Sequence, residues 1–148
     1  MGTLTLPSSG AVYLDSNCLI YSVEKIEPYS SLLSPVWASS HSGSIEIVCS
    51  QLVLLETLVK PVREGDGLLE SLFRELLLES GGVHLLPITQ ATLEQALLLR
   101  AHVGLKTPDA IHAATALGAN CSLFLTNDPA FTKAQDLPVA LLSSFVGL

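Results

Sequence analysis

Short apolar runs alternate along the chain with longer segments in which apolar residues recur at helical spacing. The short runs hold too few residues for a helix and predict buried strands. These runs cover residues 11–14, 45–49, 83–88, 121–125 and 139–142. Pro87 places the third run toward an edge of the sheet, because proline cannot donate a hydrogen bond to a central ladder.

The segments between these runs predict helices, most clearly over residues 68–79, where leucines and Phe73 recur at helical spacing. The predicted helices cover residues 17–23, 29–40, 51–59, 68–79, 90–102 and 108–118, with one further helical turn over 131–134. We expect Asp15 or Ser16 to cap the first helix. The third helix is expected to stop near Pro61. The last long helix is expected to begin with Thr107 as its N-cap, directly before a proline.

Strands that alternate with helices predict a parallel sheet with helices on both faces. The fold class is therefore α/β, in three α/β/α layers, with a central parallel sheet of four to five strands. A chain of 148 residues is expected to form a single domain, residues 1–148, whose residues 1–10 are a loosely ordered N-terminus. Functional sites of such folds gather beyond the carboxyl ends of the strands.

Composition narrows the class of protein. Hydrophobic residues make up 49% of the chain, which is ample for a core, yet no apolar run reaches the roughly 18 residues of a membrane span. The N-terminal segment lacks the basic region of a signal peptide, so we expect a cytoplasmic protein with no membrane partner. Cys18, Cys49 and Cys121 lie far apart, which predicts buried, reduced thiols.

The formal net charge is −7, which argues against a protein that coats nucleic acid and is compatible with an enzyme that concentrates carboxylates in one cleft. Four acidic residues stand where such a cleft would form. Asp15 ends the first strand, Glu56 lies in the helix after the second, Asp109 opens the helix before the fourth, and Asp128 follows the fourth.

Carboxylates that converge repel one another unless cations screen them. Asp109 has no arginine nearby, and Lys106 lies outside its helix, so a metal ion is a candidate partner for this carboxylate. Hard oxygen ligands of this kind suit Mg²⁺ or Mn²⁺. Basic residues are few, and Lys60, Arg63 and Lys106 are the candidates for contact with a nucleic-acid backbone.

Each carboxylate also has an ordinary structural interpretation. Asp15 can cap a helix, Asp128 in the segment Thr-Asn-Asp-Pro suits a turn, and Glu56 can be a solvated helix residue. His112 follows Asp109 by one helical turn, and we expect it to pack within its helix with both ring nitrogens hydrogen-bonded. No HxxxH or HExxH spacing indicates a zinc site.

Four segments resemble, in the same order, the motifs of the PIN domain family, especially its ribonuclease toxins of the VapC type. The segments are VYLDSN (12–17), SQLVLLET (50–57), LKTPDAIHAA (105–114) and FLTNDPAF (124–131). The resemblance covers nearly the whole chain, from residue 12 to residue 143. The third segment is the most recognisable, and all four in order are far more specific than any one alone.

The resemblance implies metal-dependent endonucleolytic cleavage of RNA by a toxin of a toxin–antitoxin pair, with Mg²⁺ or Mn²⁺ as cofactor. The residues it implies are Asp15, Glu56, Asp109 and Asp128 as the metal-binding and catalytic quartet, with Ser16 and Thr126 or Asn127 as polar helpers. It also implies a small antitoxin as partner and a homodimer. The antitoxin would lie along an apolar groove formed by helices near Leu19, Leu32 and Trp37.

Two other functions remain open at this point. One is a PIN-like binding module that acts without cleavage in an RNA-processing complex, although the complete acidic quartet speaks against it. The other is a phosphoryl-transfer protein, either a receiver domain or a phosphatase of the haloacid-dehalogenase type. A receiver needs adjacent acidic residues after the first strand, and the phosphatase needs a second aspartate two residues after the first. Ser16 and Asn17 occupy these positions.

Overall fold

A five-stranded sheet, in which every neighbouring pair of strands is parallel, forms the centre of the protein. The structure is a computed structural model that describes residues 3–146. The strands are β1 (Ala11–Leu14), β2 (Glu46–Ser50), β3 (His84–Leu86), β4 (Leu123–Thr126) and β5 (Val139–Leu141). Their order across the sheet is β3-β2-β1-β4-β5, which confirms the fifth strand and the edge position of β3.

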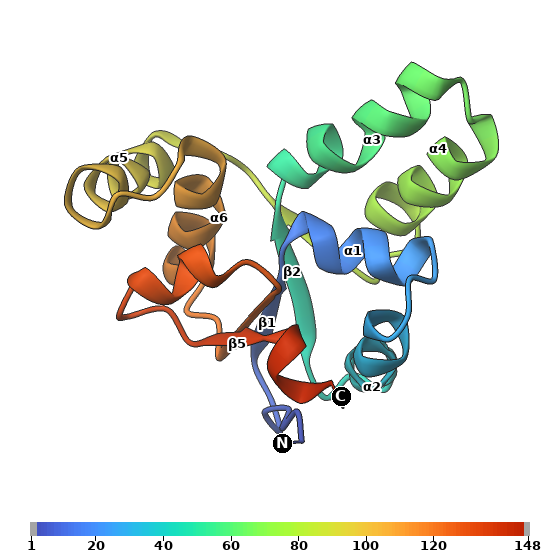
Figure 1. Ribbon diagram of the computed structural model, residues 1–148, viewed down its shortest axis with the longest axis horizontal. Coiled ribbons are helices and arrows are strands. Elements are labelled where there is room, and N and C mark those ends of the chain that lie inside the picture. Colours follow the sequence, from blue (N-terminus) through green and yellow to red (C-terminus); the bar gives the residue numbers. More distant parts are fainter. Residues whose placement is uncertain (1–2, 147–148) are drawn as a thin grey trace.

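Helices cover both faces of the sheet and complete the predicted three layers (Figure 1). The connections from β1 to β2 and from β2 to β3 contain α1 (Ser16–Val23), α2 (Tyr29–His41), α3 (Leu52–Glu64) and α4 (Gly67–Arg74). The return from β3 to β4 contains α5 (Gln90–Leu98) and α6 (Thr107–Gly118), which lie across the sheet from the other four. Because crossovers are right-handed, the change of direction at β1 places the two groups of helices on opposite faces.

Successive residues of the central strands contribute to two separate cores. Val12 and Leu14 of β1 pack in the core that includes α1 and α2, whereas Tyr13 between them packs in the core formed with α5 and α6. The same alternation holds in β2, where Ile47 faces the first core and Val48 the second. Strands buried on both faces account for the short, continuous apolar runs in the sequence.

The helices differ from the predictions mainly at their ends. The prediction that the third helix stops near Pro61 is wrong, because α3 includes this proline and ends at Gly65, which has a left-handed backbone. Pro61 lies in the last turn, where its ring is buried and the helix loses a single hydrogen bond. The predicted helices 68–79 and 90–102 each divide into an α-helix and a π-helical turn, namely η1 (Glu75–Glu79) and η2 (Leu99–Val103).

The start of α6 and the N-terminal segment also depart from simple expectation. Thr107 is the first residue of α6 and not its N-cap; Lys106 occupies the cap position without a side-chain cap hydrogen bond. Residues 3–10 form no helix or strand, and Leu4 and Leu6 pack against the first core. Residues 1 and 2 of the expected N-terminal segment lie outside the described residues.

The three cysteines are buried free thiols, as predicted. Cys18 and Cys49 donate hydrogen bonds to backbone carbonyls of β4 and β1. Burial raises the pKa of Cys121 to about 11, which keeps this thiol protonated at neutral pH. Within residues 3–146, no helix combines the length and the hydropathy that crossing a membrane would require.

A backbone test concerns Gly104, which ends η2 with a φ of 82° and leads the chain toward Asp109. An added Cβ would meet nothing within 4 Å, so Gly104→Ala introduces backbone strain alone. We expect the strain to lower the free energy of unfolding by about 1 kcal/mol. Thermal unfolding should register it as a fall in Tm of about 2–4 °C. Gly118→Ala is the matched control, since its site is equally open and its φ is not positive. Equal Tm values for the two variants would contradict the strain argument.

Candidate functional site

The candidate site lies where the central strands end. The strand order reverses at β1, which has β2 on one side and β4 on the other, and ligands of open α/β sheets bind beside such a reversal. Asp15 follows β1 directly and Asp128 lies just beyond β4. Glu56 lies in α3 and Asp109 in the first turn of α6. The chain therefore delivers the four predicted carboxylates from four different elements.

Asp15 is buried, with 4% of its surface exposed, and both of its carboxylate oxygens accept hydrogen bonds. Oδ1 accepts from the backbone N–H of Cys18 at 3.1 Å, so that Asp15 and not Ser16 caps α1. Oδ2 accepts from the hydroxyl of Thr126 at 2.5 Å. Burial raises the pKa of Asp15, while these two hydrogen bonds oppose that shift. Asp15 thus has the structural role of a cap at the same time as its place in the site.

Thr126 connects two of the carboxylates. Its hydroxyl donates to Asp15 and accepts from the backbone N–H of Asp128 at 3.0 Å. Asp128 in turn caps the short helix η3 (Pro129–Lys133), since its Oδ1 accepts from the backbone N–H of Ala130 at 2.9 Å. One buried hydroxyl therefore joins the carboxylate that follows β1 to the backbone that follows β4.

Asn127 and Ser16, the other two predicted helpers, lie beside these carboxylates. Oδ1 of Asn127 accepts from the backbone N–H of Ser143 at 3.0 Å, and its Nδ2 donates to the hydroxyl of Tyr21 at 3.4 Å. Asn127 therefore braces the loop after β4 against α1 and the C-terminal segment. Ser16 is half-buried at the first position of α1, next to Asp15.

Asp109 shows that the carboxylates influence one another. It is half-buried, and burial is the main reason why its pKa is raised. The negative charges of Asp128, Glu56 and Asp15 raise the pKa further. Because charge–charge effects fall with distance, Asp128, Glu56 and Asp15 lie within electrostatic reach of Asp109.

Glu56 is held by His112. The Nε2 atom of His112 lies 2.6 Å from Oε1 of Glu56, and Nδ1 of His112 lies 2.6 Å from the hydroxyl of Tyr13. The expectation that His112 packs in its helix with both nitrogens hydrogen-bonded is confirmed, and Tyr13 is a residue that sequence reasoning missed. The available signals were a tyrosine within an otherwise aliphatic strand and a histidine one turn after Asp109.

No lysine or arginine is paired with any of the four carboxylates within residues 3–146. The ion pairs of lysine and arginine there join Lys60 to Glu24 and Arg74 to Glu70. In the same part of the chain, no group of three or more His, Cys, Asp or Glu is close enough to enclose a metal ion. The donors nevertheless fit Mg²⁺ in kind, because this ion keeps several waters and binds proteins through one or two carboxylates.

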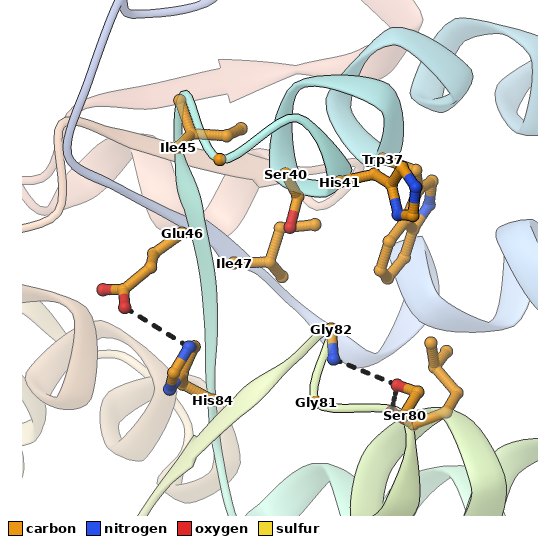
Figure 2. A pocket seen from close by; sticks show the side chains of 12 residues that line it. Trp37, Ser40, His41, Ile45, Glu46, Ile47, Ser80, Gly81, Gly82 and His84 are labelled. Carbon is orange, nitrogen blue, oxygen red and sulfur yellow. Dashed lines mark hydrogen bonds and ion pairs between the residues drawn. The ribbon is translucent and has the colours of Figure 1, made fainter.

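A hollow of about 660 Å³ lies at the opposite end of the sheet, where β2 and β3 begin (Figure 2). Trp37, Ser80 and Gly82 line it, together with an ion pair between His84 and Glu46 at 3.3 Å. None of the four carboxylates contributes to this hollow. It is therefore separate from the candidate site.

The sequence of this chain matches the model of a known family. The sequence model of the PIN domain matches residues 12–137. This chain belongs to the PIN domain family. PIN domains are nucleases, hydrolases of phosphodiester bonds.

Solved PIN-fold structures from several bacteria superpose on nearly the whole chain. VapBC2 of Rickettsia felis, bound to a DNA fragment from its promoter, gives a TM-score of 0.70 at 16% identity and covers 88% of this chain and 98% of its own. A toxin–antitoxin complex from Klebsiella pneumoniae gives a TM-score of 0.67 at 23% identity and covers 88% of this chain and 97% of its own. FitAcB of Neisseria gonorrhoeae gives a TM-score of 0.64 at 19% identity and covers 89% of this chain and 98% of its own. No curated protein matches this chain in sequence. These likenesses confirm the three-layer fold.

The raised pKa of Asp109 has a consequence for stability. Protonated Asp109 makes the free energy of unfolding higher than ionised Asp109 does. This stabilisation is complete below the unfolded-state pKa, and it is lost as the pH rises through the raised folded-state pKa. We therefore expect Asp109→Asn, measured in EDTA, to have a higher Tm than the wild type at pH 7.5 and an equal one near pH 4. The exposed Asp136 supplies the control, and Asp136→Asn should track the wild type at both pH values. A lower Tm for Asp109→Asn at pH 7.5 would show that the carboxylates are not crowded.

Proposed function

We propose that this PIN domain is a metal-dependent endoribonuclease of the VapC type, acting in the cytoplasm as the toxin of a toxin–antitoxin pair. The observation that carries the proposal is the placement of four carboxylates, with Asp15 directly after β1, Asp128 just beyond β4, Asp109 in the first turn of α6, and Glu56 in α3 in contact with His112 of α6. No lysine or arginine is paired to them among residues 3–146. Such a group of hard oxygen donors favours a divalent cation as its missing partner.

In this proposal each carboxylate has a role. Asp15 and Asp109 hold the principal Mg²⁺ or Mn²⁺, while Glu56 and Asp128 position a second ion or the attacking water. When bound, a divalent ion supplies charge stabilisation at the phosphate and a water of lowered pKa. The hydroxyl of Thr126 holds the carboxylate of Asp15 and also binds the backbone N–H of Asp128. Hydrolysis leaves a 3′-hydroxyl and a 5′-phosphate.

The substrate proposed for this site is single-stranded RNA, whose unstacked nucleotides can reach a rim between strand ends. Lys106 directly precedes α6, and Lys60 and Arg63 lie in the last turns of α3 after Glu56, all on the exposed surface. These side chains are the proposed contacts for the RNA backbone. Ser16 is the proposed polar helper near the attacked phosphate.

The proposed partner is a small antitoxin, a proposal supported by the solved structures with this fold, which are complexes of toxins with antitoxins. Of the groove residues expected from the sequence, Leu19 is fully buried and cannot line an open groove, since it faces the first core. The structure instead leaves apolar residues of α3 exposed, among them Leu55, Val59 and Val62. A hollow of about 510 Å³, lined by apolar side chains and Arg63, runs over them and is the better candidate for the antitoxin.

A homodimer is the second partner proposed. Leu93, Leu97 and Leu98 of α5 are each at least half exposed, and exposed apolar patches of this kind mark interaction surfaces. Light scattering of the purified chain decides between a monomer and a dimer, and a small reading frame beside the gene is the expected sign of an antitoxin.

A non-cleaving binding module is the second candidate function. The observation that favours it is that Asp15 and Asp128 each act as a helix cap, so both have a structural reason to be present. A cleavage assay separates the two functions.

Substitution of the carboxylates provides this test. Asp15→Asn keeps an oxygen to accept from the N–H of Cys18, so the cap survives while the negative charge is lost. We expect Asp15→Asn and Asp109→Asn each to reduce cleavage of a mixed RNA pool in Mn²⁺ to the level measured in EDTA, with circular dichroism unchanged. Asp136→Asn is the matched control and should cleave as the wild type does. Undiminished metal-dependent cleavage by both site variants would refute the assignment.

A further inference from the structure

A buried chain of hydrogen bonds leads from the end of β2 to Glu56. The backbone N–H of Ser50 donates to the hydroxyl of Tyr13 at 2.9 Å. That hydroxyl lies 2.6 Å from Nδ1 of His112, and Nε2 of His112 lies 2.6 Å from Oε1 of Glu56. Tyr13 is fully buried, and His112 is 2% exposed. The hydrogen-bond chain thus runs through the second core and ends at the carboxylate of Glu56.

The donors and acceptors of this chain can be ordered in one direction. The hydroxyl of Tyr13 is buried, and a buried O–H needs an acceptor for its proton. The N–H of Ser50 is a donor and cannot accept that proton, which leaves Nδ1 of His112 as the acceptor. An imidazole whose Nδ1 accepts is neutral and carries its proton on Nε2. His112 therefore donates a hydrogen bond to the carboxylate of Glu56.

Packing holds the members of the chain in place. The ring of Tyr13 stacks on that of Phe124 with a centroid distance of 4.8 Å and an interplanar angle of 3°, and it meets the ring of His112 edge-on at 5.8 Å. Phe124 is packed in turn against Phe131. Neither Tyr13 nor His112 can change rotamer without disturbing the second core, because protein interiors are close-packed.

The hydrogen-bond chain also connects Glu56 to β1 and α6, the elements that position Asp15 and Asp109. Tyr13 lies two residues before Asp15 on β1, and His112 lies three residues after Asp109 on α6. Glu56 comes from α3, which has no covalent connection to β1 or α6 nearby in the sequence, and its side chain is 26% exposed. Without the chain, a long side chain at this exposure would sample several rotamers.

We propose that His112 and Tyr13 are positioning residues for Glu56: Tyr13 fixes the tautomer of His112, and His112 holds Oε1 of Glu56 so that the carboxylate stays beside Asp109. This inference rests on the proposed metal-dependent function, since it assigns a purpose to the fixed orientation of one ligand. Hydrogen-bonded partners of ligating carboxylates typically affect metal affinity or activity by about 10–100-fold.

Three substitutions separate the steps of the chain. Tyr13→Phe removes the hydroxyl and keeps the ring that stacks on Phe124. His112→Leu removes the donor to Glu56, whereas His112→Gln retains an N–H donor on a side chain of similar reach. Thr115→Val is the matched control, because Thr115 is a buried hydroxyl on the same helix that bonds the carbonyl of Ile111 and not the chain.

The first measurement is the ¹⁵N spectrum of the imidazoles in the metal-free protein. We expect His112 of the wild type to be neutral with its proton on Nε2, and Tyr13→Phe to populate the other tautomer. A wild-type His112 with its proton on Nδ1 would overturn the proposal, and this readout needs no variant to fold.

The second measurement is the dissociation constant of Mn²⁺, determined by electron paramagnetic resonance. We expect Tyr13→Phe and His112→Leu to weaken Mn²⁺ binding by about 10-fold or more, His112→Gln to restore most of it, and Thr115→Val to leave it unchanged. In a Glu56→Ala background, His112→Leu should have no further effect, since the residue acts through Glu56. Additive losses in that double variant would overturn the positioning role.

Failure of this inference and failure of the proposed function have different signatures. If the wild type neither binds Mn²⁺ nor cleaves RNA, the proposed function is refuted, and the tautomer still decides whether the hydrogen-bond chain exists. If the wild type binds Mn²⁺ and Tyr13→Phe and His112→Leu bind it equally well, the nuclease proposal stands and the positioning proposal is refuted.

Discussion

The rest of this structure depends on carboxylates that are partly or fully removed from water. Asp15 has almost no contact with water, and Asp109 is half-buried beside three other carboxylates. Taking a carboxylate out of water is unfavourable unless hydrogen bonds or opposite charges replace the lost hydration. Here backbone N–H groups and the hydroxyl of Thr126 replace part of it, and no lysine or arginine of residues 3–146 replaces the remainder. This deficit is what the proposed divalent ion would satisfy.

The topology explains how a small chain gathers these charges. The reversal of strand order at β1 puts the helices of α3 and α6 on opposite faces of the sheet, and both contribute a carboxylate to the rim between them. β1 itself serves both cores, since Val12 and Leu14 face one and Tyr13 the other. Consequently the hydrogen-bond chain through Tyr13 and His112 can pass from the sheet to α3 within the second core.

Much of the fold was predictable from the sequence because the signals are local, whereas the roles of the four carboxylates stay predictions. Apolar runs of four or five residues identify strands, and the segments around Asp15 and Asp109 carry the resemblance to PIN domains. The helix ends were less predictable, because the burial of Pro61 and the π-turns after α4 and α5 depend on tertiary packing. Leu19 was placed on a groove because an apolar helix residue does not show which side the core covers. Tyr13 was missed because it meets His112 across 99 residues of sequence.

The central claim concerns position: separate elements bring carboxylate oxygens to one point at which a divalent ion binds. Anomalous diffraction from crystals soaked in Mn²⁺ measures that position directly. The account predicts a single strong peak, or a pair, within coordination distance of the carboxylates of Asp15 and Asp109 at the end of β1. Peaks confined to other parts of the surface, with none between these two side chains, would contradict it.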